Sequence, residues 1–552
     1  MPAFWKRRAD PTHRELLQRL AGLRLFAGLA ADALDALAGA MEWMAMPAGT
    51  VLFEQGEESD SLYVVLYGRL AVNRRDARGI IRAVGSVAAG ETVGESGLLA
   101  EHPRNATVLA LRDCEVLRLS RECFEELVGR FPNPMLRLAR FALKRNAREA
   151  RPAMPHCLAL LPAMAGVDVE GFARRLLRAL DVEHDTALIR QADAAGRDHA
   201  WFGEREAAHA RLVYLGNDSP DWRERCVRQS DCVLLLADAA RDASQARRIP
   251  PPNAHEHLSQ ILVLLQKGEP RIGSTRPWRE AFPHTTSHAH IRGDADLARL
   301  ARRLSGRGCG LVLSGGGARG FAHLGAYRAL REAGYSIDCI GGSSIGAIMG
   351  AGMAADWDYE QLREVYHRSF VVGRPVSEWT LPLVSLYSGR SVSRLLRQAF
   401  GERDIEDLPL PFYCVSTNLT SGRLEVHEHG PLWCWLRASS AIPGVLPPVF
   451  SAGRVLVDGG VVDNLPVREM RERVTGEVIA IDAGGDYALN TALEETELPP
   501  WWRLLPELFS ERRRPTMSQI LLRAGMVNSD ATTRRWRQLA NRIIRVSMPD
   551  VG

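Results

Sequence analysis

The sequence lacks several features that would place it in a specialised class of protein. It has no apolar run near the ~18 residues that span a bilayer. Its nine cysteines include no C-x-x-C pair, so neither a zinc site of that type nor a disulfide scaffold is expected. No apolar stretch follows the basic residues near the N-terminus, so no signal peptide is predicted. We expect a cytoplasmic protein with reduced thiols.

An excess of charge of one sign is also missing. The 70 lysines and arginines are nearly balanced by 66 aspartates and glutamates, for a net charge of +4. This balance argues against a protein that coats nucleic acid, and we expect no nucleic-acid partner. Hydrophobic residues make up 46% and charged residues 25% of the chain, which is typical of globular proteins rather than disordered ones. At about 150 residues per domain, the length predicts three or four domains.

Residues 1–150 are predicted to form a small β-roll flanked by helices. Apolar residues recur at helical spacing over residues 11–46, and from Thr50 short β-forming runs alternate with glycines. A helical stretch from Arg121 to about residue 150 closes this domain, and residues 151–155 form a predicted linker.

Residues 156–304 alternate apolar runs, such as CLALLPA and CVLLLADA, with amphipathic segments such as VEGFARRLLRAL. This alternation predicts a parallel sheet covered by helices, that is, an α/β connecting domain. The segment contains no GxxxxGK[ST] sequence and no glycine-rich turn after its first strand. We therefore interpret it as a structural or interaction module.

Residues 308–552 repeat the order of strand, turn and helix, and here the turns carry candidate functional residues. The first turn, LVLSGGGARG, contains Gly315, Gly317 and Gly320 in a GxGxxG pattern. Asp338 follows at a distance that fits a dinucleotide site, so this alternative has to be weighed. A GxGxxG pattern alone is a weak signal.

The second turn favours ester chemistry. The strand after the first turn ends in GSSIG, a GxSxG sequence in which Gly342 and Gly346 permit a sharp turn that exposes Ser344. A dinucleotide site needs no exposed nucleophile. An attacking serine does need donors for the oxyanion that forms on the acyl carbon, and the first turn offers three backbone amides for this purpose: Gly315, Gly316 and Gly317.

The sequence also offers a candidate base for Ser344. Asp458 ends the β-like run RVLV and precedes two glycines, which places a carboxylate at a strand end. Its reference pKa of about 3.9 keeps it ionised at neutral pH but makes it a weak base unless its surroundings raise that value. None of the nearby histidines occupies a strand end that suits a catalytic triad, and we expect His323 to pack within a helix; the four are His323, His367, His427 and His429.

These motifs together resemble those of the patatin-like phospholipases. The matching stretches are SGGGARG, GSSIG, ASSAIPGVLPP and DGGVVDNLPV, spread over roughly residues 310–470. The resemblance implies a catalytic dyad of Ser344 and Asp458, an oxyanion hole at Gly315–Gly317 and no required metal. The glycine-rich motif of that family often opens with aspartate, where this sequence has Ser314.

The N-terminal β-roll carries a second resemblance. GESGLL at 94–99 and PRNAT at 103–107 resemble the phosphate-binding cassette of cyclic nucleotide-binding domains. The resemblance implies a ligand site at Gly94, Glu95, Arg104 and Thr107, with Glu95 accepting a ribose hydroxyl and Arg104 pairing with a phosphate. The regulator would be cyclic AMP or cyclic GMP. The alternative is a domain that keeps the fold and has lost the ligand.

The middle segment, especially RLVYLGNDSPDWRERCVRQSDCVLLLADA, resembles the connecting region of the neuropathy target esterase family. This resemblance implies a serine esterase acting on lysophospholipids or phospholipids, with a cyclic nucleotide-binding-type β-roll, a middle α/β domain and a patatin-like α/β domain. A silent signalling scaffold that responds to a cyclic nucleotide is the alternative. A transcription regulator is disfavoured because no helix-turn-helix follows the β-roll.

The C-terminal region is basic and rich in tryptophan and leucine. Residues 501–552 contain ten arginines and four acidic residues, and Trp501, Trp502 and Phe509 lie near Arg512 and its two arginine neighbours. This composition suits either peripheral contact with the inner membrane face or a helix packed on the catalytic domain.

Overall fold

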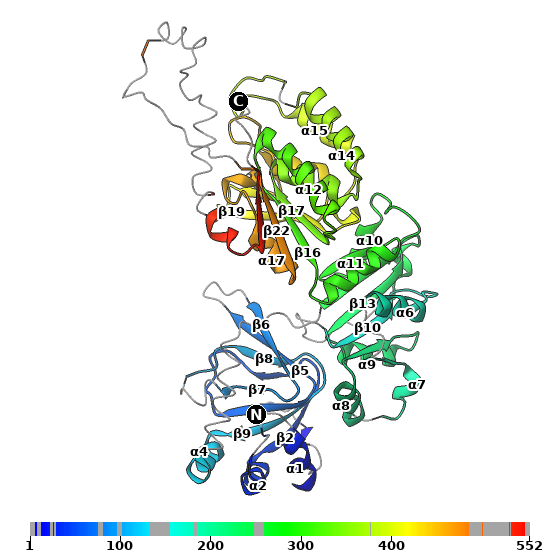
Figure 1. Cartoon of the computed structure of the whole chain (residues 1–552), viewed down its shortest axis with the longest axis vertical. Coiled ribbons are helices and arrows are strands. Elements are labelled where there is room, and N and C mark those ends of the chain that lie inside the picture. Colours follow the sequence, from blue (N-terminus) through cyan, green and yellow to red (C-terminus); the bar gives the residue numbers. More distant parts are fainter. Residues whose placement is uncertain are drawn as a thin grey trace. The chain divides into compact units, whose positions relative to one another are not determined.

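The computed structural model describes residues 6–7, 13–22, 26, 29–75, 81–95, 102–132, 155–180, 185–197, 199–247, 259–375, 377–484, 499–500, 529 and 532–546. The chain divides into two compact units, Met1–Leu265 with Ala281–His288 and Gln266–Glu280 with Ala289–Gly552. The first unit contains a β-roll and an α/β sheet, and the second contains another α/β sheet (Figure 1). The multidomain fold predicted from the sequence is confirmed.

The β-roll consists of two antiparallel sheets, with strand orders β1-β2-β9-β4-β7 and β3-β8-β5-β6. Strand β4 shows why the two sheets pack together: alternate residues point to opposite faces of a strand. Leu62 and Val64 pack with the helices, whereas Tyr63 and Val65 pack with the second sheet. The elements are β1 (Lys6–Arg7), α1 (His13–Gly22), α2 (Ala31–Ala40), β2 (Glu42–Met46), β3 (Val51–Phe53), β4 (Ser61–Tyr67), β5 (Arg69–Arg75), β6 (Ile81–Ala88), β7 (Thr92–Val93), β8 (Thr107–Ala110), β9 (Cys114–Ser120) and α4 (Arg121–Arg130).

The middle domain has five parallel strands in the order β11-β12-β10-β13-β14. All six residues of β10 are buried, as expected for a strand covered by helices on both faces. The sixth strand, β15, contains the boundary between the two units. The elements are β10 (Cys157–Pro162), α6 (Val169–Leu180), β11 (Thr186–Ile189), α7 (Gln191–Ala194), α8 (His199–Ala208), β12 (Arg211–Leu215), α9 (Pro220–Arg228), β13 (Cys232–Asp238), β14 (Ser259–Leu265), α10 (Thr275–Ala281), β15 (Ser287–Ile291) and α11 (Asp294–Leu304).

The C-terminal sheet has the order β20-β21-β18-β17-β16-β22-β23, with β19 paired to β18. Strands β18, β17, β16, β22 and β23 are parallel, and β21 runs antiparallel to β18. The strands are β16 (Cys309–Leu313), β17 (Cys339–Ser343), β18 (Phe412–Asn418), β19 (Arg423–His427), β20 (Val449–Ser451), β21 (Arg454–Asp458), β22 (Glu477–Asp482) and β23 (Arg542–Arg545). The helices are α12 (Ala322–Glu332), α13 (Ile345–Ala354), α14 (Tyr359–Tyr366), α15 (Arg390–Phe400), α16 (Leu432–Ser439) and α17 (Val467–Arg473).

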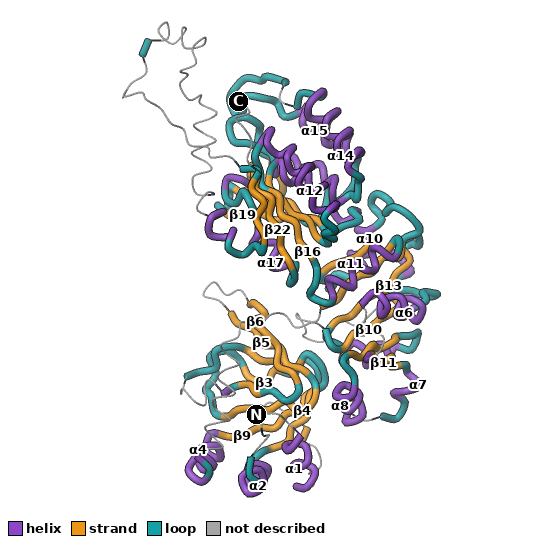
Figure 2. The backbone as a smooth tube through the Cα atoms, in the orientation of Figure 1, coloured by secondary structure: helices purple, strands orange, loops and turns teal. Residues whose placement is uncertain are grey.

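Helices cover both faces of this sheet (Figure 2). In β16, Leu311 and Leu313 pack against the core that contains α12 and α13, whereas Val312 packs against the core that contains α17. The buried α13 is rich in glycine and alanine, which lets it approach the sheet closely. This arrangement places the start of α13 at the carboxyl ends of the parallel strands, where α/β proteins form their ligand sites.

Candidate active site

Ser344 occupies a sharp turn between β17 and α13. Its φ of 53° and ψ of −126° are unusual for a residue with a side chain, and such a conformation persists only where the surroundings enforce it. The neighbouring glycines let the turn form. A Cβ on Gly342 would lie 2.7 Å from the Gly346 carbonyl carbon, and one on Gly346 would lie 2.4 Å from the Ser314 oxygen.

The strand pairing brings Ser344 and Asp458 to the same level of the sheet. Ser343 is paired with Val415 of β18, and the next residue, Ser416, is paired with Asp458 of β21. The Ser344 hydroxyl donates a hydrogen bond of 2.6 Å to the Asp458 Oδ2. Two residues that are 114 positions apart in the chain are therefore hydrogen-bonded in the arrangement that a serine nucleophile and its base require.

The surroundings of Asp458 strengthen it as a base. Its side chain is buried, and burial raises its pKa to about 6, against the opposing effect of hydrogen bonds from Ser344 and the Gly460 amide. The Gly460 amide donates to Oδ1 at 2.8 Å, so the two carboxylate oxygens have separate partners. A carboxylate with this pKa stays ionised at neutral pH and accepts a proton more readily than an exposed aspartate does.

The glycine-rich turn lies directly against the nucleophile. A Cβ on Gly315 would lie 3.1 Å from the Ser344 Cβ. The Gly315 amide donates to the Asn464 carbonyl at 3.2 Å, and this bond removes it from the predicted set of free oxyanion donors. Among the described residues, the amides of Gly316 and Gly317 donate to no backbone carbonyl. Of the three amides predicted as oxyanion donors, those of Gly316 and Gly317 therefore remain the candidates.

Sequence reasoning missed two residues that hold this site together. Ser439, at the end of α16, accepts a 3.0 Å hydrogen bond from the Ser344 amide through its Oγ. Asn464 bonds the glycine-rich turn through both its backbone carbonyl and its side-chain Nδ2, which donates to the Gly315 oxygen at 3.3 Å. Both residues lie in stretches that resemble the family motifs, ASSAIPG and DGGVVDNLP. These two motifs were the sequence signal that could have identified Ser439 and Asn464 as site residues.

The structure gives three of the four histidines partners other than Ser344. His323 is fully buried, with its Nε2 2.8 Å from the Ser314 oxygen, and burial lowers its pKa to about 4. His427 contacts the Ser416 hydroxyl, and His429 contacts Arg279. The fourth, His367, is exposed. The expectation that His323 packs within its helix is confirmed.

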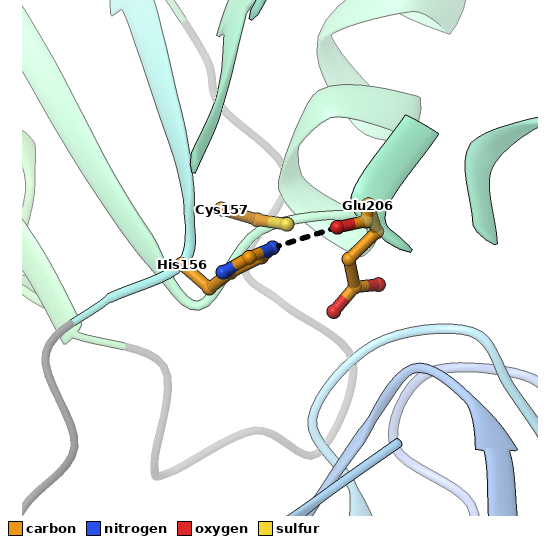
Figure 3. Close-up of side chains that lie close together, drawn as sticks. All are labelled: His156, Cys157 and Glu206. Atoms are coloured by element: carbon orange, nitrogen blue, oxygen red, sulfur yellow. Dashed lines mark hydrogen bonds between the residues drawn. The ribbon is translucent and has the colours of Figure 1, made fainter. Parts of the chain in front are cut away.

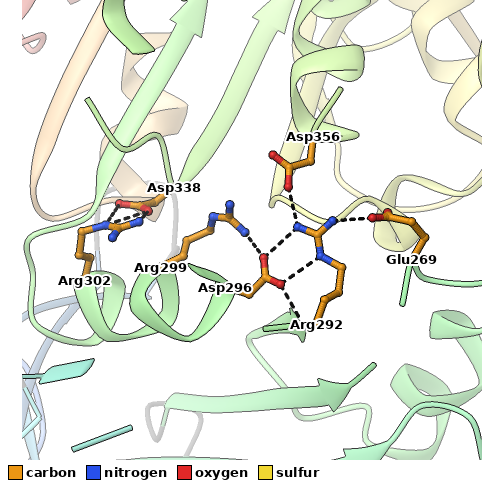
Figure 4. Close-up of polar contacts among 7 residues, drawn as sticks. All are labelled: Glu269, Arg292, Asp296, Arg299, Arg302, Asp338 and Asp356. Atoms are coloured by element: carbon orange, nitrogen blue, oxygen red, sulfur yellow. Dashed lines mark hydrogen bonds and ion pairs between the residues drawn. The ribbon is translucent and has the colours of Figure 1, made fainter. Parts of the chain in front are cut away.

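The dinucleotide alternative is wrong. A ribose-binding carboxylate has to face a cleft, but Asp338 is completely buried. Arg302 of α11 donates to both of its oxygens, and the Cys309 amide donates to Oδ2 at 2.9 Å. Figure 4 shows this pair beside a second cluster in which Arg292 bridges Asp296 and Asp356. Asp338 is thus a structural ion-pair partner.

In the β-roll, the predicted phosphate ligand points inward. Arg104 is 4% exposed and donates to the Ser61 oxygen at 2.8 Å and the Gly94 oxygen at 3.1 Å. Its guanidinium carbon lies 4.1 Å from the centre of the Phe53 ring. Burial lowers the pKa of Arg104, against the opposing effect of nearby groups that include Asp60.

The other predicted ligand residues lie around this guanidinium. Gly94 has a φ of 89°, and a Cβ there would lie 2.4 Å from the Arg104 Nη1, so a glycine is needed at this position. Glu95 is buried, and the Thr107 hydroxyl accepts a hydrogen bond from the Gln55 amide. Residues 96–101 of the cassette lie outside the described residues, as do Trp501, Trp502, Phe509 and Arg512 of the basic C-terminal region and residues 133–150 of the predicted closing helix.

Among the described residues of the middle domain, His156, Cys157 and Glu206 form a group with the composition of a metal site (Figure 3). The Arg112 guanidinium contacts both the Cys157 sulfur and the Glu206 carboxylate. Burial raises the pKa of the Cys157 thiol well above its usual value, so it is not a ready thiolate ligand. With a cation already among these groups, we interpret them as part of an ion-pair cluster.

A cleft of about 460 Å³ lies at the carboxyl ends of β10 and β12. Three acidic residues line it, Asp168, Glu170 and Asp218, and no lysine or arginine does. Two of these carboxylates are paired with arginines, Asp218 with Arg247 and Glu170 with Arg174 and Arg190. The segment has no GxxxxGK[ST] sequence, so the lining of this cleft includes no lysine of a phosphate-binding loop.

Comparison with protein families gives three matches along the chain. Residues 43–131 match the cyclic nucleotide-binding domain, residues 155–300 match the Neuropathy Target Esterase family P-loop like domain, and residues 311–471 match the patatin-like phospholipase family. The three matches follow the order expected from the sequence motifs.

Individual proteins are similar over the same span. Patatin-like phospholipase domain-containing protein 6 of Mus musculus is 30% identical over 89% of this chain and 42% of its own length. Lysophospholipase NTE1 of Coccidioides immitis is 30% identical over 89% of this chain and 37% of its own length. The chain therefore spans about two fifths of the length of these curated relatives. A solved cyclic nucleotide-binding domain from Methylobacillus flagellatus KT covers 25% of the chain, with 79% of its own length aligned, 25% identity and a TM-score of 0.23.

Proposed function

We propose that this chain is a serine esterase of the neuropathy target esterase family that cleaves acyl esters of lysophospholipids or phospholipids. Its middle segment matches a domain of that family and lies between matches to the cyclic nucleotide-binding domain and the patatin-like phospholipases. The observation that carries the proposal is the 2.6 Å hydrogen bond between Ser344 and a buried Asp458. We place the catalytic domain at residues 308–552, after a nucleotide-binding-like domain at 1–150 and a connecting domain at 156–304.

The proposed reaction begins with attack of the Ser344 oxygen on the ester carbonyl while Asp458 accepts the hydroxyl proton. The oxyanion binds the amides of Gly316 and Gly317, supported by the positive end of α13, which starts next to Ser344. Asp458 then passes its proton to the departing alcohol, leaving an acyl group on Ser344. Water attacks this acyl-enzyme while Asp458 accepts a proton from it. Asp458 then passes that proton to the Ser344 oxygen, which regenerates the hydroxyl as the fatty acid leaves.

The test is the variant Ser344→Ala. It removes only the Oγ from a half-buried turn, so the fold should remain while lysophospholipid hydrolysis and labelling by a fluorophosphonate probe are lost. Near wild-type hydrolysis by this variant would exclude Ser344 as the nucleophile. If the wild-type protein hydrolysed no ester and took up no probe, the alternative of a silent signalling scaffold would replace the proposal.

The β-roll supports a regulatory addition to this proposal. Arg104 is a buried cation beside Gly94 and Glu95, within the residues 43–131 that match the cyclic nucleotide-binding domain. We propose that Arg104 binds the phosphate of cyclic AMP or cyclic GMP, and that its hydrogen bonds to the phosphate replace those it now donates to carbonyl oxygens.

We also propose peripheral contact with a membrane, because the substrate class is a lipid. No helix among the described residues is long and apolar enough to cross a bilayer.

A further inference from the structure

The second unit contains a short hairpin that precedes α15. The Ser388 amide donates to the Glu378 carbonyl at 2.9 Å, and the Thr380 amide donates to the Leu386 carbonyl at 3.1 Å. Between these bonds, the rings of Trp379 and Tyr387 lie 4.6 Å apart. We call residues 378–388 the apolar hairpin.

The tip of the apolar hairpin is made of exposed hydrophobic side chains. Leu381 is 72% exposed, Leu383 83% and Val384 61%, and Trp379 at the base is 71% exposed. Single exposed apolar residues are ordinary on protein surfaces, but four within six positions of one hairpin mark an interaction site. Val371 and Val372, a few residues before the hairpin, are exposed as well.

The apolar hairpin is fixed to the catalytic machinery. The Leu386 amide donates to the Gly444 carbonyl at 2.9 Å, and the Tyr387 amide donates to the Val445 carbonyl at 3.1 Å. Gly444 and Val445 lie in the segment that joins Ser439, the partner of the Ser344 amide, to the strand that ends in Asp458. Whatever the hairpin binds is therefore held at a set position relative to the nucleophile.

The sequence around the apolar hairpin is basic. Residues 367–397 contain five arginines and a single carboxylate, Glu378. Glu378 accepts hydrogen bonds from Ser388 and Ser391 and forms an ion pair with Arg394 at 3.4 Å, so its charge is offset by one of these arginines. Arg374 and Arg390, on either side of the hairpin, are exposed and face solvent.

This combination identifies the partner. Apolar side chains at a tip, a tryptophan at the base and flanking arginines match the layers of a phospholipid surface, in which acyl chains lie beneath phosphates. A second copy of this chain fits less well, because pairing two such hairpins would bring their arginines together.

We propose that the apolar hairpin inserts into a phospholipid surface and holds the catalytic domain there with Ser344 within reach of lipid esters. The proposal names the surface that would deliver substrate, and in that respect it rests on the proposed function. Binding itself can be measured without hydrolysis.

The test uses the full chain with Ser344→Ala, which leaves vesicle lipids intact, and measures co-sedimentation with phosphatidylcholine vesicles with and without phosphatidylglycerol. The triple variant Leu381→Ser, Leu383→Ser and Val384→Ser should lower vesicle affinity by more than about tenfold, because three apolar side chains no longer enter the lipid. Arg374→Gln with Arg390→Gln should weaken binding only to vesicles that contain phosphatidylglycerol.

A matched control is Ile272→Ser. Ile272 is also an exposed aliphatic residue, 56% exposed, but it lies beside Gly401. Gly401 follows the C-terminal end of the 11-residue α15, about 16 Å along the helix from the hairpin. This control should bind vesicles as the parent does. When the three hairpin substitutions are made in the chain that keeps Ser344, the variant should hydrolyse a soluble short-chain ester at the wild-type rate.

Three results would overturn the proposal. Unchanged vesicle binding by the triple variant would remove the hairpin from the membrane contact. If the triple variant lost soluble-ester hydrolysis to the same extent as vesicle binding, the hairpin would be part of the acyl pocket. If the chain formed a concentration-dependent dimer that the triple variant did not form, the hairpin would be an interface between copies. If the wild-type chain bound vesicles through the hairpin but hydrolysed no ester, only the proposed function would fail.

Discussion

Burial changes the acidity of Asp458 in the direction that a general base requires. An exposed aspartate is ionised but holds a proton poorly, whereas Asp458 has a pKa of about 6 because its ionised form is poorly solvated. The bonds from Ser344 and Gly460 prevent a larger rise. The side chain can therefore be ionised before the reaction and still accept the serine proton during it.

The first prediction concerns the identity of the base. Asp458→Asn keeps the size of the side chain but cannot take the proton, so kcat should fall by roughly 10²–10⁴-fold. His323→Ala should cost far less in turnover, since that imidazole contacts the Ser314 oxygen rather than Ser344. Steady-state kinetics on one lysophospholipid compares the two variants, and the reverse order would indicate a histidine base.

The pH profile provides the second prediction. Asp458 must be ionised to act, so kcat/KM should rise as the pH increases through about 6 and then level off. Asp463, whose pKa burial raises to about 7, is the nearby group that could produce a similar limb. In Asp463→Asn the limb near pH 6 should remain. Its disappearance would assign the limb to Asp463.

The third prediction concerns the strained backbone of Ser344. At a φ of 53°, a side chain costs roughly 1–3 kcal/mol, and glycine avoids this cost at an entropic expense of about 0.5–1 kcal/mol. Ser344→Gly should therefore be more stable to unfolding than Ser344→Ala by about 1 kcal/mol. Denaturant titration of the two inactive variants measures the difference, and equal stability would show that the turn is not strained.

At the scale of elements, the site depends on how closely α13 approaches β16. A Cβ on Gly346 would meet the carbonyl oxygens of Ser314 and Leu313 at 2.4 and 2.5 Å. These are backbone atoms of the neighbouring strand and turn, which cannot move aside cheaply. The helix would have to shift, and the Ser344 turn would shift with it.

The fourth prediction follows from this contact. Gly346→Ala should destabilise the fold by about 1–3 kcal/mol and lower kcat more than tenfold. Gly325→Ala is the control, because Gly325 lies inside α12 with no atom within 4 Å of an added Cβ, so alanine there should stabilise by about 0.5–1 kcal/mol. Thermal unfolding and turnover are measured for both, and wild-type activity in Gly346→Ala would contradict the argument.

The elements that carry Ser344 and Asp458 could be predicted from the sequence because their signals are local. The GxSxG turn and the strand before Asp458 are each contained within a few consecutive residues. The supporting contacts could not be predicted, because their partners are far apart in the sequence. Ser439 and Ser344 are separated by 95 positions, and Asn464 and Gly315 by 149. The loss of the Gly315 amide from the oxyanion donors depends on one such long-range bond. The inward orientation of Arg104 depends on the carbonyls of Ser61 in β4, 43 positions away, and of Gly94, just after β7.

At the scale of the whole molecule, the chain combines a domain that matches the patatin-like phospholipases with one that matches the cyclic nucleotide-binding domains. Their presence in one chain does not by itself establish control. A ligand regulates an activity only if it binds one arrangement of the protein more tightly than another, since equal affinity for both shifts nothing. Binding and regulation therefore need separate measurements.

The fifth prediction is that the full chain binds cyclic AMP or cyclic GMP through Arg104. A charge-assisted bond to phosphate contributes about 1.5–3 kcal/mol, so Arg104→Ala should weaken binding by roughly 10- to 150-fold. Gly94→Ala should weaken it too, because the added Cβ would displace the Arg104 Nη1. Calorimetry on the full chain measures both, with Gly129→Ala in α4, where an added Cβ meets nothing within 4 Å, as the control. If neither nucleotide produced heat or a thermal shift, the β-roll would be a docking module. If a nucleotide bound but changed lysophospholipid turnover equally in the parent and in Arg104→Ala, the change would not act through this site.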